Sequence, residues 1–136
     1  MNGVVRFCAA TILVSFVLTS QATAQCVASK HISGAWHSND GGTYYVKRIG
    51  HTIWWMGESA DNGVSWTNVF KGTWREEDNT VTGDWADVYG NFDGKGTLTL
   101  RINGQIGVGV HGFDKIGGTG SGFGGERWFK PCNDTN

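Results

Sequence analysis

The sequence predicts an all-β domain, an up-and-down antiparallel barrel of about eight strands, and three observations lead there. No segment beyond residue 24 carries apolar residues at helical spacing over a useful length. Short stretches rich in β-branched and aromatic residues alternate with Asn, Asp and Gly turn signals at regular spacing. Two cysteines, Cys26 and Cys132, lie at the two ends of this region. A two-sheet β-sandwich is the main alternative.

The first 24 residues are expected to be a secretory signal peptide. Arg6 gives a weakly positive start, residues 4–18 are apolar, and residues 22–24 fit a small-x-small cleavage site. The apolar run is shorter than the roughly 20 residues that a membrane-spanning helix needs. We therefore expect residues 1–24 to be the signal and residues 25–136 to form a single β-barrel domain. The protein would be secreted or periplasmic.

Cys26 and Cys132 are predicted to form a disulfide, because an even pair of cysteines in an exported protein is usually oxidised. In the chain-entropy model, closing so long a loop contributes roughly 4–5 kcal/mol. The bond also requires the two Cα atoms to lie within about 7 Å of each other. The first and last strands are therefore expected to be neighbours, as they are in a closed barrel.

The first strand is expected at residues 35–38, before an Asn-Asp-Gly-Gly turn, and residues 42–58 follow as the central hairpin. Adjacent side chains on a strand point to opposite faces. This alternation separates Tyr44 from Tyr45, and Trp54 from Trp55. Which tryptophan points inward depends on the register of the strand, which the sequence does not fix.

The remaining strands are expected at residues 64–74, 80–88, 96–102, 106–110 and 126–130. Residues 96–102 alternate most cleanly and would place their leucines and isoleucine in the core. Asn103-Gly104 is typical of a type I′ hairpin turn, after which Ile106, Val108 and Val110 would continue the inward face. The glycine-rich run at residues 117–125 predicts a mobile loop at the barrel mouth, able to gate a ligand.

Composition argues against several function classes. The formal net charge is −1, and the scattered basic residues form neither a stripe for nucleic acid nor a basic amphipathic helix for membranes. The four histidines lack metal-ligand spacing, so we expect no metal and no cofactor. An acid/base pair for glycoside cleavage could come from Glu58, Asp61, Asp84 and Asp87, but nothing sets their separation. We therefore do not expect an enzyme.

The aromatic side chains are the main candidates for binding. Seven tryptophans exceed what a small core usually holds, and buried indole N–H groups need partners. Such rings form platforms for sugars or walls for an apolar ligand. The alternatives are a tryptophan-rich core and an oligomer interface. Asn68 and Asp87 share mostly apolar strand faces and would either orient a ligand or lie hydrated at the barrel rim. The predicted ligand-binding residues are Tyr44, Trp54, Trp55, Trp66, Asn68, Trp85 and Asp87.

Gly34-Ala35-Trp36 resembles the Gly-x-Trp opening of lipocalins and avidins, the calycin-like barrels. Asn39-Asp40 and Gly42 also resemble the avidin opening. The resemblance implies a barrel and, loosely, a binding role. It also implies that Trp36 closes the barrel floor with Arg127 on its ring, a cation–π contact. Biotin binding is not implied, because the later tryptophan and serine positions of an avidin site have no match. GGTYYVKRIG and WADVYG resemble stretches of small exported bacterial proteins of unassigned function.

These observations predict a secreted, non-catalytic binding protein whose aromatic side chains hold a small molecule or a carbohydrate. One alternative is a protein-binding module, such as an inhibitor of an exported enzyme, that uses the outer face of the central hairpin. The weakest alternative is a small hydrolase. A hollow interior would favour a small-ligand carrier. A filled interior with a flat patch at Trp54 or Trp55 would rule out the small-ligand carrier and favour glycan or protein partners.

Overall fold

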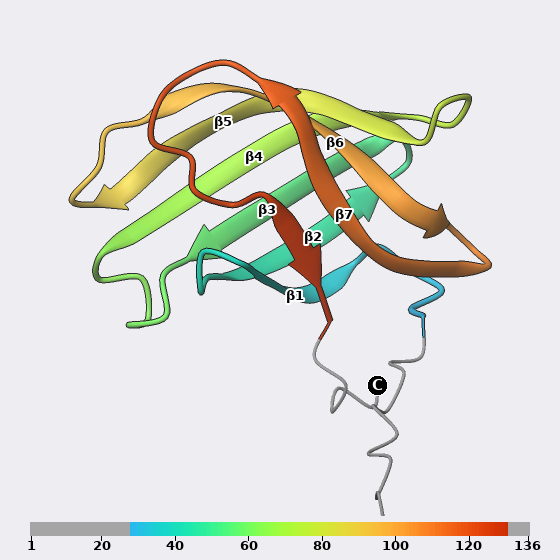
Figure 1. Cartoon of the computed structure of the whole chain (residues 1–136), viewed down its shortest axis with the longest axis horizontal. Coiled ribbons are helices and arrows are strands. Elements are labelled where there is room, and N and C mark those ends of the chain that lie inside the picture. The colour runs from blue at the N-terminus through green and yellow to red at the C-terminus, as the bar shows by residue number, and fades with distance from the viewer. Residues whose placement is uncertain (1–27, 131–136) are drawn as a thin grey trace, which may run out of the picture.

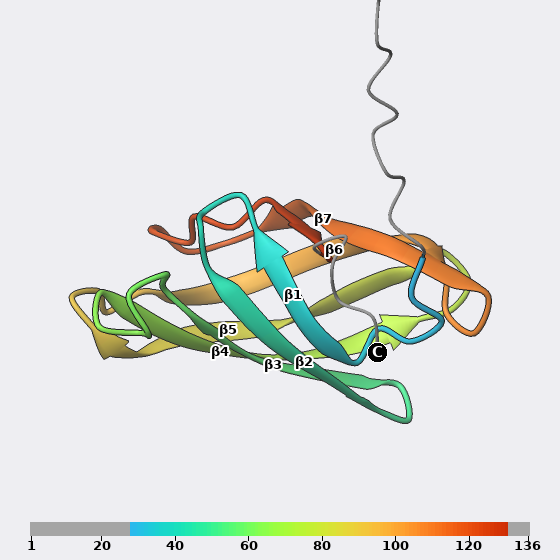
Figure 2. The same cartoon turned by 90° about the horizontal axis from the view of Figure 1, so that it is seen from below.

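The computed structural model describes residues 28–130, in which eight strands form one closed antiparallel barrel in chain order (Figure 1). The strands are β1 (Gly34–Ser38), β2 (Thr43–Ile49), β3 (Thr52–Glu58), β4 (Trp66–Arg75), β5 (Thr80–Gly90), β6 (Lys95–Gln105), β7 (Gly109–Gly118) and β8 (Arg127–Phe129). Figure 2 shows the barrel as flattened, with β6 and β7 lying across from β2–β5. The predicted up-and-down barrel is confirmed, and the sandwich alternative is wrong.

The barrel closes between β1 and β8 through a short seam. Only His37 with Phe129 and Ser38 with Trp128 are in register there. The side chain of Asn39 extends the seam, because its Oδ1 accepts hydrogen bonds from the backbone N–H groups of residues 126 and 127 at 2.8 and 2.9 Å. The first and last strands are therefore neighbours, as expected. The predicted signal peptide, Cys26 and Cys132 lie outside the described residues, so the cleavage and the disulfide stay predictions.

Aromatic rings fill most of the barrel interior. Trp55 stacks on Phe70 with ring centroids 4.3 Å apart, and Phe113 stacks on Trp128 at 5.2 Å. Trp36 is fully buried and lies 5.0 Å from Phe113. Trp55 is thus the inward residue of its pair, and Trp54 points outward. A large cavity through the middle of the barrel is excluded by this packing.

Glycines face several of these rings. A Cβ added at Gly57 would lie 2.4 Å from the Tyr44 ring, and one at Gly72 would lie 2.5 Å from the Phe70 ring. The backbones of β4 and β5 also approach closely at Gly83, where a Cβ would lie 2.0 Å from the Lys71 carbonyl oxygen. The rings fit inside the barrel because neighbouring inward positions carry no side chain.

The turn predicted at Asn103-Gly104 is wrong. β6 continues to Gln105 with a register shift at Asn103/Gly104, and the chain turns at residues 106–108. The Asn79 side chain holds this bulge by donating to the carbonyl oxygen of Gly104 at 2.6 Å. Val108 consequently lies in the turn and is 71% exposed, instead of continuing the inward face. Val110 is buried, as predicted.

Arg127 does not lie over Trp36. Its neighbour Trp128 points into the core, so strand alternation turns Arg127 outward, where its Nε lies 3.4 Å from an Asp114 carboxylate oxygen. The cation on the Trp36 ring is Lys130, with its Nζ 5.2 Å from the ring centroid. The basic residue on the Trp36 ring is therefore Lys130, three positions after the predicted Arg127.

Gly83→Ala should lower the free energy of unfolding by about 1–3 kcal/mol, because the added methyl group would collide with the β4 backbone. Urea denaturation measures this change. Gly117→Ala is the control, since its Cβ would meet nothing closer than the Thr99 Cβ at 3.7 Å. Equal unfolding midpoints for the two variants would contradict the close approach of β4 and β5.

Candidate functional site

Four connections meet at one end of the barrel, because consecutive antiparallel strands alternate in direction. They are the β1–β2, β3–β4, β5–β6 and β7–β8 connections. A pocket of about 210 Å³ opens among them, which we call the mouth pocket. It is lined by Asp40, Trp66, Asn68, Asp87, Phe92, Gly122, Phe123 and Gly124.

Asn68 and Asp87 supply the polar groups of the mouth pocket from paired positions on β4 and β5. The buried Asn68 accepts a hydrogen bond on Oδ1 from Trp55 Nε1 at 3.0 Å. Asp87 accepts one on Oδ2 from the Gly94 backbone N–H at 2.8 Å. Burial raises the pKa of the Asp87 carboxyl, an effect partly offset by the Gly94 hydrogen bond. The pocket thus contains a carboxylate that would gain from a further hydrogen-bond donor.

Asp40 is already engaged by the protein. Its Oδ2 accepts a 2.6 Å hydrogen bond from the Tyr44 hydroxyl, and its Oδ1 accepts a 2.9 Å bond from the Gly42 backbone. Burial, followed by the nearby Asp40 charge, raises the pKa of the Tyr44 hydroxyl far above its ordinary value. Tyr44 therefore remains a protonated donor, and the pair fixes the turn after β1 beneath the pocket.

Phe123 covers the inner aromatic residues from the loop after β7. Its ring lies 4.8 Å from Trp85 and 6.1 Å from both Trp55 and Trp128. Within residues 28–130, the buried Nε1 groups of Trp85 and Trp128 have no hydrogen-bond partner. Unpaired buried donors are uncommon in folded proteins. Both indoles that pack near Phe123 therefore carry an N–H donor without a partner in this range.

The glycine-rich loop begins later than the sequence indicated. Gly117 and Gly118 belong to β7, and Thr119 still bonds to Thr97 through its backbone at 2.9 Å. The part that covers the mouth pocket contains Gly122, whose φ of +95° favours glycine. It lies at the mouth, where the sequence predicted a loop.

Three of the seven predicted ligand-binding residues line the mouth pocket: Trp66, Asn68 and Asp87. Tyr44, Trp55 and Trp85 point inward but are buried in the aromatic core. Trp54 lies apart, on the outer face of β3. Sequence reasoning missed Asp40, Phe92 and Phe123. A single large apolar residue within a glycine-rich run is the signal that could have identified Phe123.

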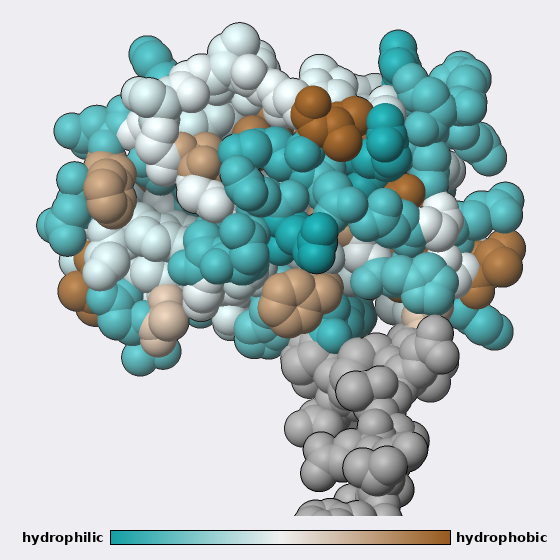
Figure 3. All heavy atoms as spheres, in the orientation of Figure 1, coloured by the Kyte–Doolittle hydropathy of each residue, from teal (hydrophilic) through white to brown (hydrophobic). Residues whose placement is uncertain are grey.

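The outer face of β2–β4 carries a group of exposed apolar side chains. Tyr45, Met56 and Val69 are paired in one row across the three strands, and Trp54 lies in the next row. Lys71 lies over the Trp54 ring, with its Nζ 5.0 Å from the centroid, and so covers part of it. Figure 3 shows the opposite side of the barrel, where β7 and β8 face the viewer in Figure 1, and there apolar residues form small separate patches among hydrophilic ones.

The four carboxylates considered for catalysis are dispersed. Glu58 accepts a hydrogen bond from the Tyr45 hydroxyl at 3.1 Å, and Asp84 faces outward opposite Lys71. Asp61 accepts hydrogen bonds from serines in the β3–β4 loop, which lower the pKa of its carboxyl to about 2. Of these four, Asp87 is the one that lines the mouth pocket.

Residues 28–130 contain no cluster of three His, Cys, Asp or Glu side chains suited to a metal ion. In the same part of the chain, no helix is long and apolar enough to span a membrane. No protein-family model, curated protein or solved structure matches this chain.

The stability of Asp87→Asn relative to that of the wild type should be greater at pH 7 than at pH 3. The raised pKa means that folded Asp87 binds its proton more tightly than the unfolded chain does. The free energy of unfolding of the wild type therefore falls as the pH rises. The fall begins near pH 3.8, the ordinary pKa of an aspartate, and continues through the higher pKa of Asp87 in the folded protein. Asparagine carries no such charge and keeps an acceptor for the Gly94 N–H. Thermal unfolding at both pH values measures the difference.

Asp84→Asn, on the outer face of the same strand, is the control for this pH effect. A stability difference between Asp87→Asn and wild type that does not grow with pH would contradict the burial of the Asp87 charge.

Proposed function

We propose that the protein is a non-catalytic binding protein that holds a small, polar, ring-containing ligand in the mouth pocket. The observation that carries the proposal is the placement of Asn68 and Asp87 beside Trp66, in a pocket at the end of an otherwise filled barrel. Its volume of about 210 Å³ is below the roughly 300–1,000 Å³ of drug-sized sites. The ligand would therefore be about the size of a monosaccharide or a single heterocycle.

Each pocket residue has a distinct task in this proposal. Asp87 accepts a hydrogen bond from a ligand hydroxyl or N–H group. Asn68 uses its Oδ1 for Trp55, so its amide Nδ2, which also faces the Tyr44 hydroxyl, is the group that would donate to the ligand. Trp66 and Phe92 supply flat apolar walls. Such a site selects a ring that carries a donor and an acceptor close together.

The filled interior supports a ligand at the mouth over one carried deep in the barrel. Phe123 lies over Trp85 and Trp128, so outward movement of its loop would deepen the pocket toward both indoles. Their N–H groups would then face a ligand acceptor. The glycines of the loop allow such a movement, because a residue without a Cβ has few steric limits on its backbone angles.

The architecture supports the same proposal at a coarser level. A closed eight-stranded antiparallel barrel is compatible with the calycin-like resemblance of the first strand. An exported protein, secreted or periplasmic, would meet small ligands outside the cytoplasm. Both the calycin-like relationship and the export belong to the proposal.

A protein-binding role is the second candidate, and the row of Tyr45, Met56 and Val69 beside Trp54 favours it. Exposed aromatic and methionine side chains are enriched in protein interfaces. In that case the partner would lie on the outer face of β2–β4, and the mouth pocket would play no part.

The first test is a ligand screen with monosaccharides and small heterocycles, read by saturation-transfer NMR and quantified by calorimetry. For a ligand that binds, Asp87→Asn should weaken affinity at least about tenfold, because a hydrogen bond to a charged group contributes roughly 1.5–3 kcal/mol. Trp66→Leu should also weaken it. Trp54→Leu is the matched tryptophan control and should leave affinity unchanged.

Loss of binding in Trp54→Leu, with Trp66→Leu unaffected, would place the ligand on the outer face and contradict the mouth site. A stable complex with an exported protein that only Trp54→Leu disrupts would favour the second candidate.

Phe123→Ala should accelerate association of the same ligand, because the ring that covers the inner pocket is removed. Stopped-flow tryptophan fluorescence measures the rate. The control is Phe129→Ala, an exposed phenylalanine on β8. An unchanged association rate in Phe123→Ala would show that Phe123 does not gate the pocket.

A further inference from the structure

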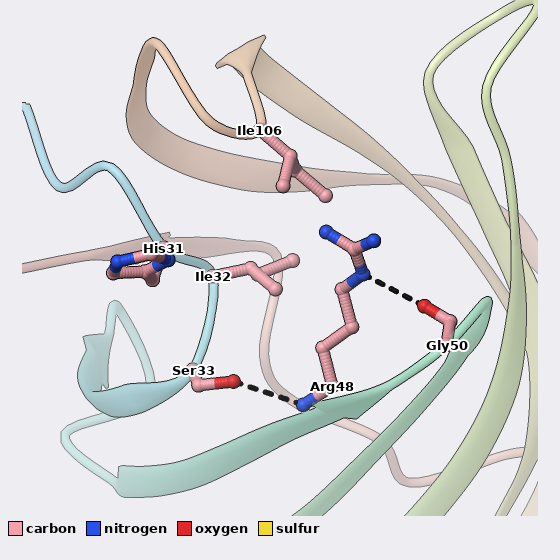
Figure 4. Close-up of a pocket in the computed structure, with 6 residues that line it drawn as sticks. All are labelled: His31, Ile32, Ser33, Arg48, Gly50 and Ile106. Atoms are coloured by element: carbon pink, nitrogen blue, oxygen red, sulfur yellow. Dashed lines mark hydrogen bonds between the residues drawn. The ribbon is translucent and has the colours of Figure 1, made fainter.

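The opposite end of the barrel carries a second pocket, of about 270 Å³, which we call the floor pocket (Figure 4). It lies between the segment that precedes β1, the β2–β3 hairpin and the β6–β7 hairpin. Its lining residues are His31, Ile32, Ser33, Arg48, Gly50 and Ile106. We propose that the floor pocket binds the carboxylate of a small branched aliphatic acid, with Arg48 as the binding cation.

The guanidinium of Arg48 is held in place before any ligand arrives. Its Nε donates to the Gly50 carbonyl oxygen at 2.7 Å, and its central carbon lies 4.7 Å from the centroid of the Trp74 ring. The backbone N–H of the same residue donates to Ser33 Oγ at 3.0 Å. A side chain fixed in this way loses little conformational entropy on binding.

The remaining edge of the guanidinium faces the pocket. Figure 4 shows the two terminal nitrogens of Arg48 directed toward Ile106, while Nε points to Gly50. Within residues 28–130 the ion pairs are Arg75–Asp78 and Arg127–Asp114, so Arg48 has no carboxylate partner in this range. Two parallel N–H groups on a planar fork match the two oxygens of a carboxylate.

The walls of the pocket define the rest of the ligand. Ile32 is buried and is anchored by its carbonyl oxygen, which accepts a 2.7 Å hydrogen bond from Trp36 Nε1. Ile106 closes the opposite side, where Gly107 N–H donates to the Lys30 carbonyl oxygen at 2.9 Å. Because Ile106 is the more exposed of the two isoleucines, the aliphatic part of the ligand would lie against Ile106. With one arginine pointing inward, a singly charged carboxylate is matched better than a phosphate dianion.

This site is separate from the mouth pocket and does not depend on the proposed function. The test uses the full chain labelled with ¹⁵N and titrated with isobutyrate, with the Gly50 amide and the Arg48 Nε–H as reporters. Isobutyrate should shift these signals saturably. Isobutyramide has nearly the same shape without the charge and should not shift them. Inorganic phosphate should bind more weakly than isobutyrate.

Arg48→Gln should reduce isobutyrate affinity at least about tenfold, with the Gly50 amide as reporter. Arg48→Lys keeps the charge without the fork and should also weaken binding, which tests the site if Arg48→Gln fails to fold. Arg101→Gln, an exposed arginine on β6, is the matched control and should bind as wild type does. Unchanged affinity in both Arg48 variants overturns the proposal. Equal shifts with isobutyramide, or phosphate binding at least as tightly, also overturn it.

Discussion

The fit between aromatic rings and inward-facing glycines governs the rest of this structure. Several of the large rings in this narrow barrel lie against an inward position that lacks a side chain, as at Gly57 beneath Tyr44 and Gly72 against Phe70. The same relation holds near the mouth, where Gly94 faces Trp85. This pairing accounts for a sequence that is rich in both tryptophan and glycine. It also fixes the register, because a shift of one residue would move every ring outward.

The two pockets follow from this packing. Rings fill the middle of the barrel, so both pockets lie at its ends, where the strands diverge into turns. The ends differ chemically. The mouth pocket combines the Asp87 carboxylate with aromatic walls, whereas the floor pocket combines the Arg48 guanidinium with two isoleucines. One small domain thus presents an acidic and a basic recess at opposite ends.

The features that depend on local pattern could be predicted from the sequence, and those that depend on distant contacts could not. Alternation and turn residues indicated eight strands and placed Asn68 and Asp87 on inward faces. The prediction of a turn at Asn103-Gly104 was wrong because Asn79, more than twenty positions earlier, holds a bulge there. The choice between Trp54 and Trp55 required the pairing with β2 and β4. Arg48 carried no local signal, because its contacts with Gly50, Ser33 and Trp74 are what hold it in place.

The seam between β1 and β8 gives the barrel one weak edge. All other neighbouring strands share longer ladders, whereas here a few backbone pairs and the Asn39 side chain maintain closure. Local unfolding should therefore begin at this point, releasing the two ends of the domain together while β2–β7 remain paired. An opened seam exposes free strand edges that can add a strand from another molecule. A covalent link such as the one predicted between Cys26 and Cys132 would oppose that route to aggregation.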